Sequence, residues 1–422
     1  MVVKPGYKYT EVGVIPEDWE FKSVQEFAAV KGGKRLPLGR SLTDKPTGHP
    51  YIRVTDMRPG GVEPGDIRYV PDEIFPAIRN YRIRIQDLFI SVAGTLGIVG
   101  KIPPEFDGAN LTENADKITD ITCDRDYLLY SLSAERIQNS IASVKTIGAQ
   151  PKLAINQIEA FRIALPPTIA EQRAIATALS DVDALLGGLE RLIAKNRDLK
   201  QAAMQQLLTA RTRLPGFHGE WEVKSLDQIT SRAAGVWGKN EPGKHNNRRV
   251  EIIRAGDISQ DGRLTATAYR YISNAEFNKA KCDLDDLVIT TSGNGLGKVW
   301  WCDGRGDIAA SNFVRVLHPY KRDVSGKFLY YALRTVEGSR RLQEHTATSA
   351  YPNLRPTFFS TSWIPVPPLR EQIAIAAVVT DMDAELAALE VRRDKTRAVK
   401  QAMMQELLTG RTRLVADGSG HV

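Results

Sequence analysis

The sequence is poor in the residues that build disulfides, zinc sites and catalytic dyads. It contains 3 cysteines and 6 histidines among 422 residues. Cys123, Cys282 and Cys302 lie far apart, with no Cys-x-x-Cys pair and no neighbouring histidines. We therefore expect neither a disulfide nor a bound metal. The scattered histidines predict no catalytic dyad.

Long apolar runs are also missing. The opening stretch MVVKPGYKYTEVGVIPEDW lacks the hydrophobic core of a signal peptide, and nowhere do about 18 apolar residues follow one another. The sequence therefore predicts a cytoplasmic protein with no membrane partner. Its 42% hydrophobic and 25% charged residues are typical of a folded chain.

Motifs for nucleotides and methyl donors are absent as well. No Gly-rich turn is followed by an acidic residue about 20 positions later, and no G-x-x-x-x-G-K-[S/T] loop occurs. The proline pairs at 103–104 and 166–167 do not complete the Asn/Asp-Pro-Pro-aromatic motif of amino-methyltransferases. The stretch SGNGLGK at 292–298 lacks phosphate-loop spacing, so we interpret it as a tight loop. We expect a non-catalytic chain with no cofactor of its own.

The charge balance is basic. A formal net charge of +7 and an isoelectric point near 9.1 favour an anionic partner such as nucleic acid. Charge alone does not select that partner, because many basic proteins bind nothing anionic.

What the sequence does contain is a repeat. Residues 171–214 and 371–414 are identical at 25 of 44 aligned positions. Upstream matches are weaker but keep their order: 19–20 with 221–222, 51–57 with 252–258, 87–97 with 286–297, and 149–153 with 350–354. The order predicts domain, helix, domain, helix. Either a duplicated scaffold carries two different recognition surfaces, or an old duplication drifted wherever packing did not restrain it.

Both repeated blocks predict a long helix with a coiled-coil seam, because apolar residues alternate spacings of four and three. The predicted seam residues are Ile175, Leu179, Val182, Leu186, Leu189 and Ile193, and Ile375, Val379, Met382, Leu386 and Leu389. Asn196 and Thr396 continue the seam, and they either fix its register or mark where each helix leaves its partner. A helix over residues 171–209 would be a spacer of roughly 55–60 Å.

The ends and the middle of these helices carry further signals. Thr168 and Glu171 predict a capping box, which the second helix lacks because one residue is missing before Glu371. The pair at 187–188, Gly-Gly against Ala-Ala at 387–388, indicates close approach of another backbone or simple drift. We interpret four arginines near the helix ends as complementing the helix dipole rather than binding phosphate. They are Arg211, Arg213, Arg411 and Arg413.

Residues 19–165 and 220–365 contain short β-rich runs, Gly and Pro turns, and then helical stretches. This pattern predicts two small α+β domains, each with a twisted sheet. Their basic, amide and hydroxyl side chains suit phosphates and base edges, although exposed loops are polar in any protein. The candidate DNA-binding residues are Lys31, Lys34, Arg35, Arg53, Thr95, Lys145, Gln150 and Lys152 in the first domain, and Lys239, Asn240, Lys244, Arg254, Asn294, Lys298, Thr348, Ser349, Tyr351 and Asn353 in the second.

Several motifs together resemble a known family over nearly the whole chain. PPTIAEQ and PPLREQ, the Asp-x-Asp-Ala helices, the KQ…LLT…RTRL endings and the opening IPEDWE resemble type I restriction-modification specificity subunits. The resemblance implies two target-recognition domains, each reading half of an asymmetric bipartite site in double-stranded DNA, with paired helices setting the gap. It also implies partners: two methyltransferase subunits and restriction-translocation subunits, which would use S-adenosylmethionine, Mg²⁺ and ATP.

We therefore predict an N-terminal segment (1–18), target-recognition domains (19–165 and 215–365), spacer helices (166–214 and 366–414) and a tail (415–422). The fold class is α+β, with two domains separated by two long antiparallel coiled-coil helices in a pseudo-twofold repeat. The alternative is a non-catalytic scaffold or coiled-coil adaptor that binds proteins, which predicts no sequence preference and little salt dependence in DNA binding. An intrinsic nuclease or methylase would require the motifs that are missing.

Overall fold

The computed structural model describes residues 5–11, 13–144, 151–241, 248–266, 268–293, 295–335, 338, 340, 342, 344, 346 and 352–414. The chain forms two compact units. Unit 1 comprises residues 1–189 and 392–422, and unit 2 comprises residues 190–391. In the described ranges, no helix is long and apolar enough to cross a membrane, and no group of three or more His, Cys, Asp or Glu could hold a metal ion.

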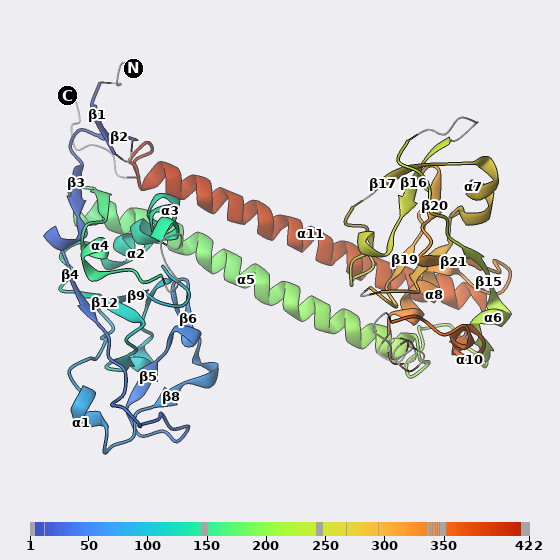
Figure 1. The fold of residues 1–422 in the computed structure, drawn as a ribbon, viewed down its shortest axis with the longest axis horizontal. Coiled ribbons are helices and arrows are strands. Elements are labelled where there is room, and N and C mark those ends of the chain that lie inside the picture. The colour runs from blue at the N-terminus through green and yellow to red at the C-terminus, as the bar shows by residue number, and fades with distance from the viewer. Residues whose placement is uncertain are drawn as a thin grey trace. The chain divides into compact units, whose positions relative to one another are not determined.

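Two long helices follow the two globular parts, which we call domain 1 (residues 5–165) and domain 2 (residues 222–366). They are α5 (Ile169–Leu207) and α11 (Leu369–Leu407), each an unbroken ribbon in Figure 1. Each helix gives its first half to the unit of its own domain and its second half to the other unit. The compact units therefore divide within the helices, not at the ends of the predicted spacers.

Within each unit the two helix halves run antiparallel. In unit 1 Asp183 of α5 pairs with Lys400 of α11, and Glu171, earlier in α5, pairs with Arg413, beyond the end of α11. Unit 2 repeats this order, because Lys200 pairs with Asp383 and Arg213, later in the chain, pairs with Glu371, earlier in α11. The predicted antiparallel pairing of the two helices is confirmed.

The predicted seam residues are all buried or half-buried, but they do not all face the other helix. Ile175 and Leu179 belong to the hydrophobic core of domain 1, and Ile375 and Val379 to that of domain 2. The first turns of each helix are thus part of a domain. Asn196 instead donates a hydrogen bond to Glu385 of α11 at 3.1 Å, which favours a role in register.

Each domain is built around an antiparallel four-stranded sheet, and the order of its strands is the same in both domains. The strands are β10 (Val99–Lys101), β9 (Leu88–Ser91), β12 (Ala115–Thr119) and β4 (Ala29–Gly32) in domain 1. In domain 2 they are β19 (Val299–Trp301), β18 (Leu287–Thr290), β21 (Val314–Pro319) and β15 (Thr230–Ala234).

Two smaller sheets are duplicated too. A three-stranded sheet with one parallel and one antiparallel pairing joins β11 (Asn110–Leu111), β5 (Pro50–Ile52) and β8 (Arg68–Tyr69), and again β20 (Ile308–Ala310), β16 (Arg248–Ile253) and β17 (Ala268–Ile272). A two-stranded sheet pairs β3 (Glu20–Ser23) with β13 (Arg162–Leu165), and β14 (Glu222–Ser225) with β22 (Trp363–Val366). Domain 1 also has the hairpins β1 (Tyr7–Thr10) with β2 (Gly13–Pro16) and β6 (Met57–Arg58) with β7 (Gly61–Val62).

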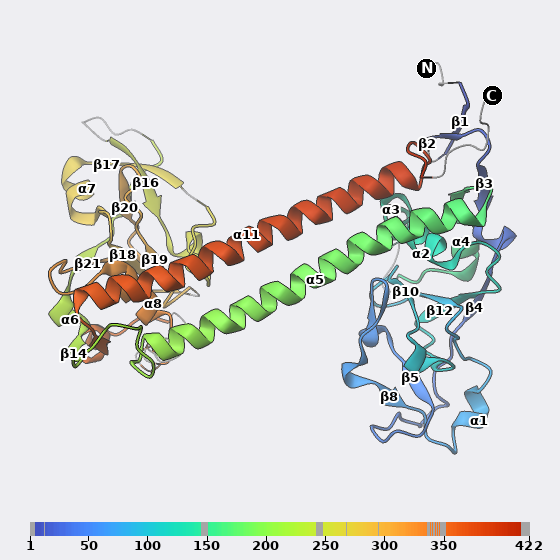
Figure 2. The same cartoon turned by 180° about the vertical axis from the view of Figure 1, so that it is seen from behind.

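Helices cover one face of each large sheet. In domain 1 these are α2 (Arg125–Ser133), α3 (Glu135–Val144) and α4 (Ile155–Glu159), and in domain 2 α8 (Gly326–Leu333) and α10 (Thr357–Thr361). The opposite face packs on the three-stranded sheet through a second cluster, which includes Phe89 in domain 1 and Val288 in domain 2. The short helices α1 (Phe75–Ile78), α6 (Leu226–Ile229) and α7 (Asn274–Ala280) complete the domains, seen from behind in Figure 2. The predicted α+β class is confirmed.

Candidate nucleic-acid interface

Two equivalent loops leave the large sheets at glycines that accept no side chain. A Cβ on Gly33, after β4, would lie 2.0 Å from the carbonyl oxygen of Thr112. A Cβ on Gly235, after β15, would lie 1.9 Å from that of Ser311. We call residues 33–43 recognition loop 1 and residues 235–240 recognition loop 2. The two domains therefore present different loop sequences at one place in the same topology.

Recognition loop 1 gathers several predicted cations. Lys34 lies 5.5 Å from the ring centre of Tyr81, and Arg35 pairs with Glu113 at 3.1 Å. Lys31, on β4, pairs with Asp120 at 3.1 Å. All three cationic side chains are exposed, so they can exchange these surface partners for phosphate at little cost.

A hydrogen bond from Tyr51 holds the loop backbone, because the Tyr51 hydroxyl donates to the carbonyl of Lys34 at 2.9 Å. Burial raises the pKa of Tyr51 to about 12, so the hydroxyl remains a donor at neutral pH.

The other predicted residues of domain 1 are dispersed. Thr95 and Lys152 are both exposed, in the turn before β10 and before α4. Lys152 lies close enough to the buried Asp116 of β12 to oppose the rise in its pKa, which burial takes to about 6. Lys145 and Gln150 lie outside the described residues.

In domain 2 the structure adds aromatic residues that the sequence reasoning missed. Lys239 and Asn240, two of the candidate DNA-binding residues, are exposed in recognition loop 2. Beside them Trp237 is 70% exposed, and the guanidinium of Arg249 lies 4.4 Å from the ring centre of Tyr269. Exposed aromatic rings among cations are typical of nucleic-acid-binding surfaces, and the aromatic-basic alternation AYRY at 268–271 could have drawn attention to this region.

The remaining candidates of domain 2 are on other loops. Lys298 is half-buried before β19, and Asn353 forms a β-bridge with Ser292. Five other candidates of domain 2 lie outside the described residues. They are Lys244, Asn294, Thr348, Ser349 and Tyr351.

Arg53 and Arg254 occupy equivalent positions and are held by carboxylates of their own domains. Arg53 forks onto the buried Asp56 at 3.1 and 2.8 Å, and Arg254 onto the buried Asp257 at 3.0 and 2.8 Å. These carboxylates raise the pKa of both guanidinium groups. The geometry favours a structural role, and a DNA contact by either residue stays a prediction.

Two of the four arginines at the helix ends bind buried glutamates, and for Arg211 and Arg411 the dipole interpretation stays a prediction. Arg413 forks onto Glu171 at 2.8 and 2.7 Å, and Arg213 onto Glu371 at 2.7 and 2.6 Å. Both glutamates are almost wholly buried. The dipole interpretation was therefore wrong for these two arginines. We call each Arg–Glu pair a latch.

The latch also explains why the predicted capping box is incomplete. The backbone N–H of Glu171 donates to the hydroxyl of Thr168 at 3.2 Å, but both carboxylate oxygens of Glu171 bind Arg413. The carboxylate is thus not available to the start of its own helix.

The glutamine of each Glu-Gln pair fastens helix to domain. Gln172 donates to the carbonyl of Pro166 at 2.8 Å and accepts from the backbone of Asp124 at 2.8 Å. Gln372 donates to Pro367 at 2.7 Å and accepts from Ser325 at 2.9 Å. Asp124 and Ser325 cap α2 and α8, so each glutamine ties a domain helix to a long helix.

The second aspartate of each Asp-x-Asp-Ala motif has the same pair of partners. Asp183 accepts from the hydroxyl of Tyr130 at 2.9 Å and pairs with Lys400 at 2.6 Å. Asp383 accepts from Tyr331 at 2.8 Å and pairs with Lys200. Burial, with the neighbouring aspartate, raises the pKa of both tyrosines, so they stay protonated donors.

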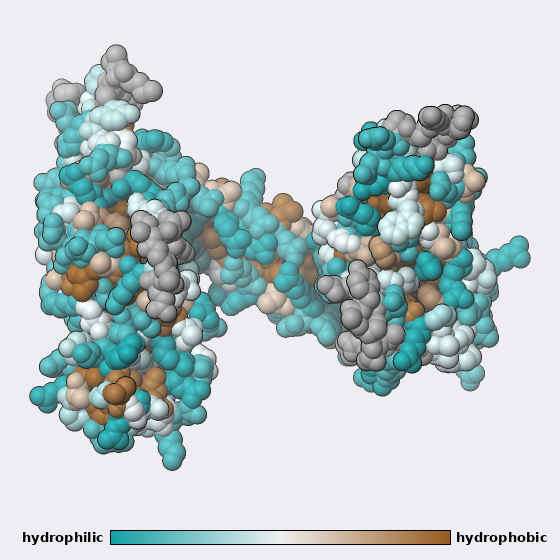
Figure 3. Space-filling view, in the orientation of Figure 1, coloured by the Kyte–Doolittle hydropathy of each residue, from teal (hydrophilic) through white to brown (hydrophobic). Residues whose placement is uncertain are grey.

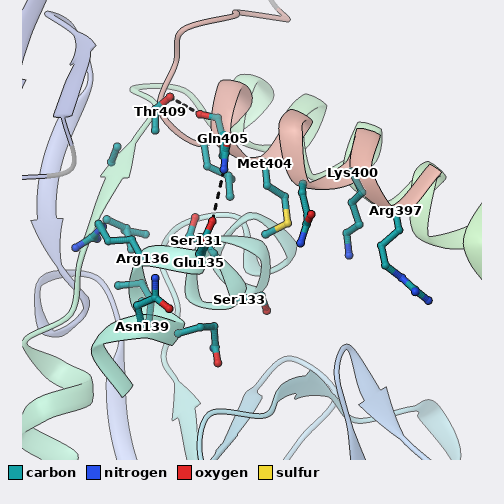
Figure 4. A pocket seen from close by; sticks show the side chains of 17 residues that line it. Ser131, Ser133, Glu135, Arg136, Asn139, Arg397, Lys400, Met404, Gln405 and Thr409 are labelled. Atoms are coloured by element: carbon teal, nitrogen blue, oxygen red, sulfur yellow. Dashed lines mark hydrogen bonds between the residues drawn. The ribbon is translucent and has the colours of Figure 1, made fainter. Parts of the chain in front are cut away.

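Next to these contacts each unit has a groove whose long-helix side is lined by matching residues. The groove of unit 1 has a volume of about 730 Å³ and lies between the α2–α3 turn and α11, from which Lys400, Met404 and Gln405 project in Figure 4. The groove of unit 2, about 950 Å³, is lined by Lys200, Met204 and Gln205 of α5. Further matched lining residues are Arg397 and Gln401, and Arg197 and Gln201.

Comparison with known proteins agrees with this duplicated architecture. The family model described as type I restriction modification DNA specificity domain matches residues 16–196 and 218–396. A putative type I restriction enzyme MjaX specificity subunit of Methanocaldococcus jannaschii is 24% identical over 97% of both chains. The EcoKI specificity subunit of Escherichia coli is 24% identical over 45% of this chain and 42% of its own.

Solved structures show the same fold. A type I restriction-modification S subunit from M. genitalium gives a TM-score of 0.60 at 16% identity, covering 97% of this chain and 98% of its own. A chain from a study of type I complex assembly and conformational transition gives 0.56 at 16%, covering 94% and 99%. The matches define a protein with two DNA-specificity domains. The chain belongs to the family of type I restriction-modification specificity subunits.

Proposed function

We propose that this chain reads an asymmetric bipartite DNA site, one half with each domain. The observation that carries the proposal is the duplicated topology with different side chains at its equivalent loops. After the equivalent glycines, domain 1 places Lys34 and Arg35, whereas domain 2 places Val236 and Trp237. Two copies of one scaffold with different loop chemistry can recognise two different short sequences.

Exchange of one domain tests this proposal. Residues 19–165 are replaced by the equivalent segment of another specificity subunit, and the methylated sequence is mapped in cells that contain the partner subunits. One half of the methylated motif should change while the other half keeps its bases. A change in both halves, or in neither, would contradict reading by separate domains.

We further propose that the two grooves each dock one methyltransferase subunit. On the side of the long helix, five residues of the same types line each groove at an offset of 200 positions, which suits two copies of one partner. Glutamines and a methionine beside cations suit a mixed polar and apolar protein surface. Restriction-translocation subunits would then join the assembled complex.

Filling the grooves tests the docking proposal. Gln201→Trp and Gln401→Trp each place a bulky side chain at an exposed, equivalent position. Each single variant should lose one methyltransferase subunit and the double variant both, as measured by native mass spectrometry. Ala402→Trp, also exposed on α11 but outside the lining of the groove, is the control. Retention of two subunits by the double variant would refute the assignment.

In this proposal the chain itself is non-catalytic, and S-adenosylmethionine, Mg²⁺ and ATP act in the partner subunits. Calorimetry should show S-adenosylmethionine binding to the assembled complex and not to this chain alone. Binding by the isolated chain would contradict the division of labour.

A protein-binding adaptor is the alternative, and salt separates the two. Each neutralised phosphate adds a slope of about −0.9 in log K against log salt, so DNA binding by the complex should weaken steeply. A flat response without sequence preference would favour the adaptor.

A further inference from the structure

Each recognition loop contains an apolar side chain that projects into solvent. Leu38 in recognition loop 1 is 103% exposed and Trp237 in recognition loop 2 is 70% exposed. Single exposed apolar residues are common and need no explanation. These two differ because each lies in a short segment whose backbone is held by hydrogen bonds, in equivalent loops of both domains.

Leu38 lies at a fixed corner. The N–H of Arg40 donates to the carbonyl of Pro37 at 3.1 Å, and Gly39 has a φ of +77°, which together form a type II turn with Leu38 at its first corner. On either side, Leu36 and Leu42 pack against the hydrophobic cluster that includes residues of α1. Figure 3 shows hydrophobic side chains gathered over this end of domain 1. Leu36 and Leu42 are thus anchored, whereas Leu38 between them points into solvent.

Trp237 is held in the same manner by different contacts. Before it, the N–H of Val236 donates to Ala310 at 2.9 Å. After it, Lys239 and Tyr271 exchange two backbone hydrogen bonds of 2.9 and 2.8 Å. The ring itself touches only the edge of Phe313 among the aromatic contacts of the described residues, with centroids 5.4 Å apart.

Between these anchors the backbone can turn only at glycine. Gly238 has a φ of +64°, and a Cβ there would lie 2.7 Å from the Cβ of Arg270. The indole is therefore presented outward by a backbone with little freedom to fold it back, so little entropy is lost when it binds a partner.

We propose that Leu38 and Trp237 are apolar wedges, side chains that press into the base stack of duplex DNA when the loops bind. The proposal rests on the proposed function, in which these domains read DNA. Lys34 and Arg35 are exposed in the first loop and Lys239 in the second, so each loop can neutralise nearby phosphates while its apolar group meets the bases. Leucine is a known type of wedge between base steps, and tryptophan stacks on any base.

The wedges matter for reading because unstacking a base step costs more for some sequences than for others. Flexible pyrimidine–purine steps open most easily, so each wedge adds sequence preference without a hydrogen bond to a base. One step in each half-site should therefore be selected for its deformability.

Fluorescence of 2-aminopurine tests the proposal in the full methyltransferase complex without S-adenosylmethionine. The probe is placed at successive positions of both half-sites, other than the methylated adenine. Binding of the unaltered protein should raise fluorescence at one step in each half-site. Leu38→Ala should abolish the rise in the half-site of domain 1 only, and Trp237→Ala in that of domain 2 only.

Affinity gives a second readout. Loss of stacking by Trp237→Ala should weaken DNA binding by about 5- to 150-fold, and Trp237→Phe should restore most of it. Trp363→Ala is the matched control, because Trp363 is 47% exposed on β22, outside both recognition loops. It should leave affinity and fluorescence unchanged.

The outcomes separate the wedge from the proposed function. If half-sites follow the exchanged domains but no position responds to the probe, or if Trp237→Ala keeps the full response, the wedge proposal is wrong and modular reading stands. If Trp237→Ala instead weakens assembly with the methyltransferase and leaves the DNA response intact, Trp237 meets a protein. If the complex shows no sequence preference at all, the proposed function fails first.

Discussion

Asp116 of β12 is a buried carboxyl group, opposite Gly32 and Ile90 in the sheet, and 5% exposed. Arg315 lies at the equivalent position in the large sheet of domain 2, opposite Ile289. The two sheets therefore carry residue types of opposite charge at the same position. Burial raises the pKa of Asp116 to about 6, and Lys152 opposes the shift only partly.

This carboxyl group should make stability depend on pH. Its pKa in the folded protein lies above the ordinary value of 3.8, so the buried carboxyl group does not reduce stability below about pH 4, and stability is lost as pH rises to about 6. At pH 7 Asp116→Asn should therefore increase the free energy of unfolding by on the order of 1–3 kcal/mol and raise the melting temperature, with no gain at pH 3.5. Melting curves across that range measure it, and an equal gain at both pH values would exclude titration as the cause.

For single residues, the sequence predicted which types of side chain occur in the loops better than it predicted where each side chain lies. Basic residues in loops could be named from type alone, and Lys34, Arg35 and Lys239 do lie in the recognition loops. Trp237 was missed because one sequence does not show which aromatic residues fail to find a core. Arg413 was misinterpreted because its partner, Glu171, lies 242 positions away.

At the scale of helices and strands, each latch joins the start of one long helix to the segment that follows the end of the other. Glu371 is 0% exposed and its compensating charge is Arg213, with Trp221 donating a further hydrogen bond at 3.3 Å. Removing one partner of a buried pair leaves an unbalanced charge. Arg213→Ala should therefore lower the free energy of unfolding by about 3–5 kcal/mol, and adding Glu371→Gln should recover part of this loss.

Denaturant titration measures the effect of the latch. Arg211→Ala is the control, because Arg211 is exposed, and it should change stability by less than about 0.5 kcal/mol. An equal loss in both variants would mean that the buried pair is not what stabilises the helix end.

A second element-scale prediction concerns the glycine pair in α5. A Cβ on Gly188 would meet nothing within 4 Å, so no backbone approaches closely at that position. The interpretation of this position as sequence drift is therefore favoured. Gly188→Ala should stabilise the protein by about 0.5–1 kcal/mol, because alanine is the better helix former. A lower melting temperature for the variant would show that the glycine is required.

Periodicity predicted the long helices well, since α5 and α11 both lie within the predicted segments. It could not show that Ile175 and Ile375 pack inside the domains, because an apolar seam looks the same whether it faces a helix or a sheet.

At the scale of the whole molecule, the duplication extends further than the sequence indicated. Strands of two to six residues carry too little pattern to establish pairing, yet every sheet of domain 2 has a counterpart of the same order in domain 1. The sequence showed the motifs in order, and the structure shows why they recur. The Glu, Gln, Asp, Lys and Arg of the repeat make the same contacts in both copies.

The last prediction concerns helix length and the gap between half-sites. Both α5 and α11 pass from one unit to the other, between Leu189 and Glu190 and between Val391 and Arg392. Four residues inserted at both places leave the contacts of Asp183 and Asp383 within their own units. The insertion lengthens each helix by about 6 Å and turns it by about 40° beyond one full turn.

Two base pairs span nearly that length, at about 3.4 Å each. If the helices set the distance between the domains, the methylated motif should keep both halves and lengthen its gap by one or two base pairs. Insertion of two residues should impair methylation instead, because it rotates one unit by about 200° against the other. The same four residues placed after Leu414, beyond the end of α11, should leave the gap unchanged. Active methylation with an unaltered gap in the helix variant would mean that the helices do not measure the spacing.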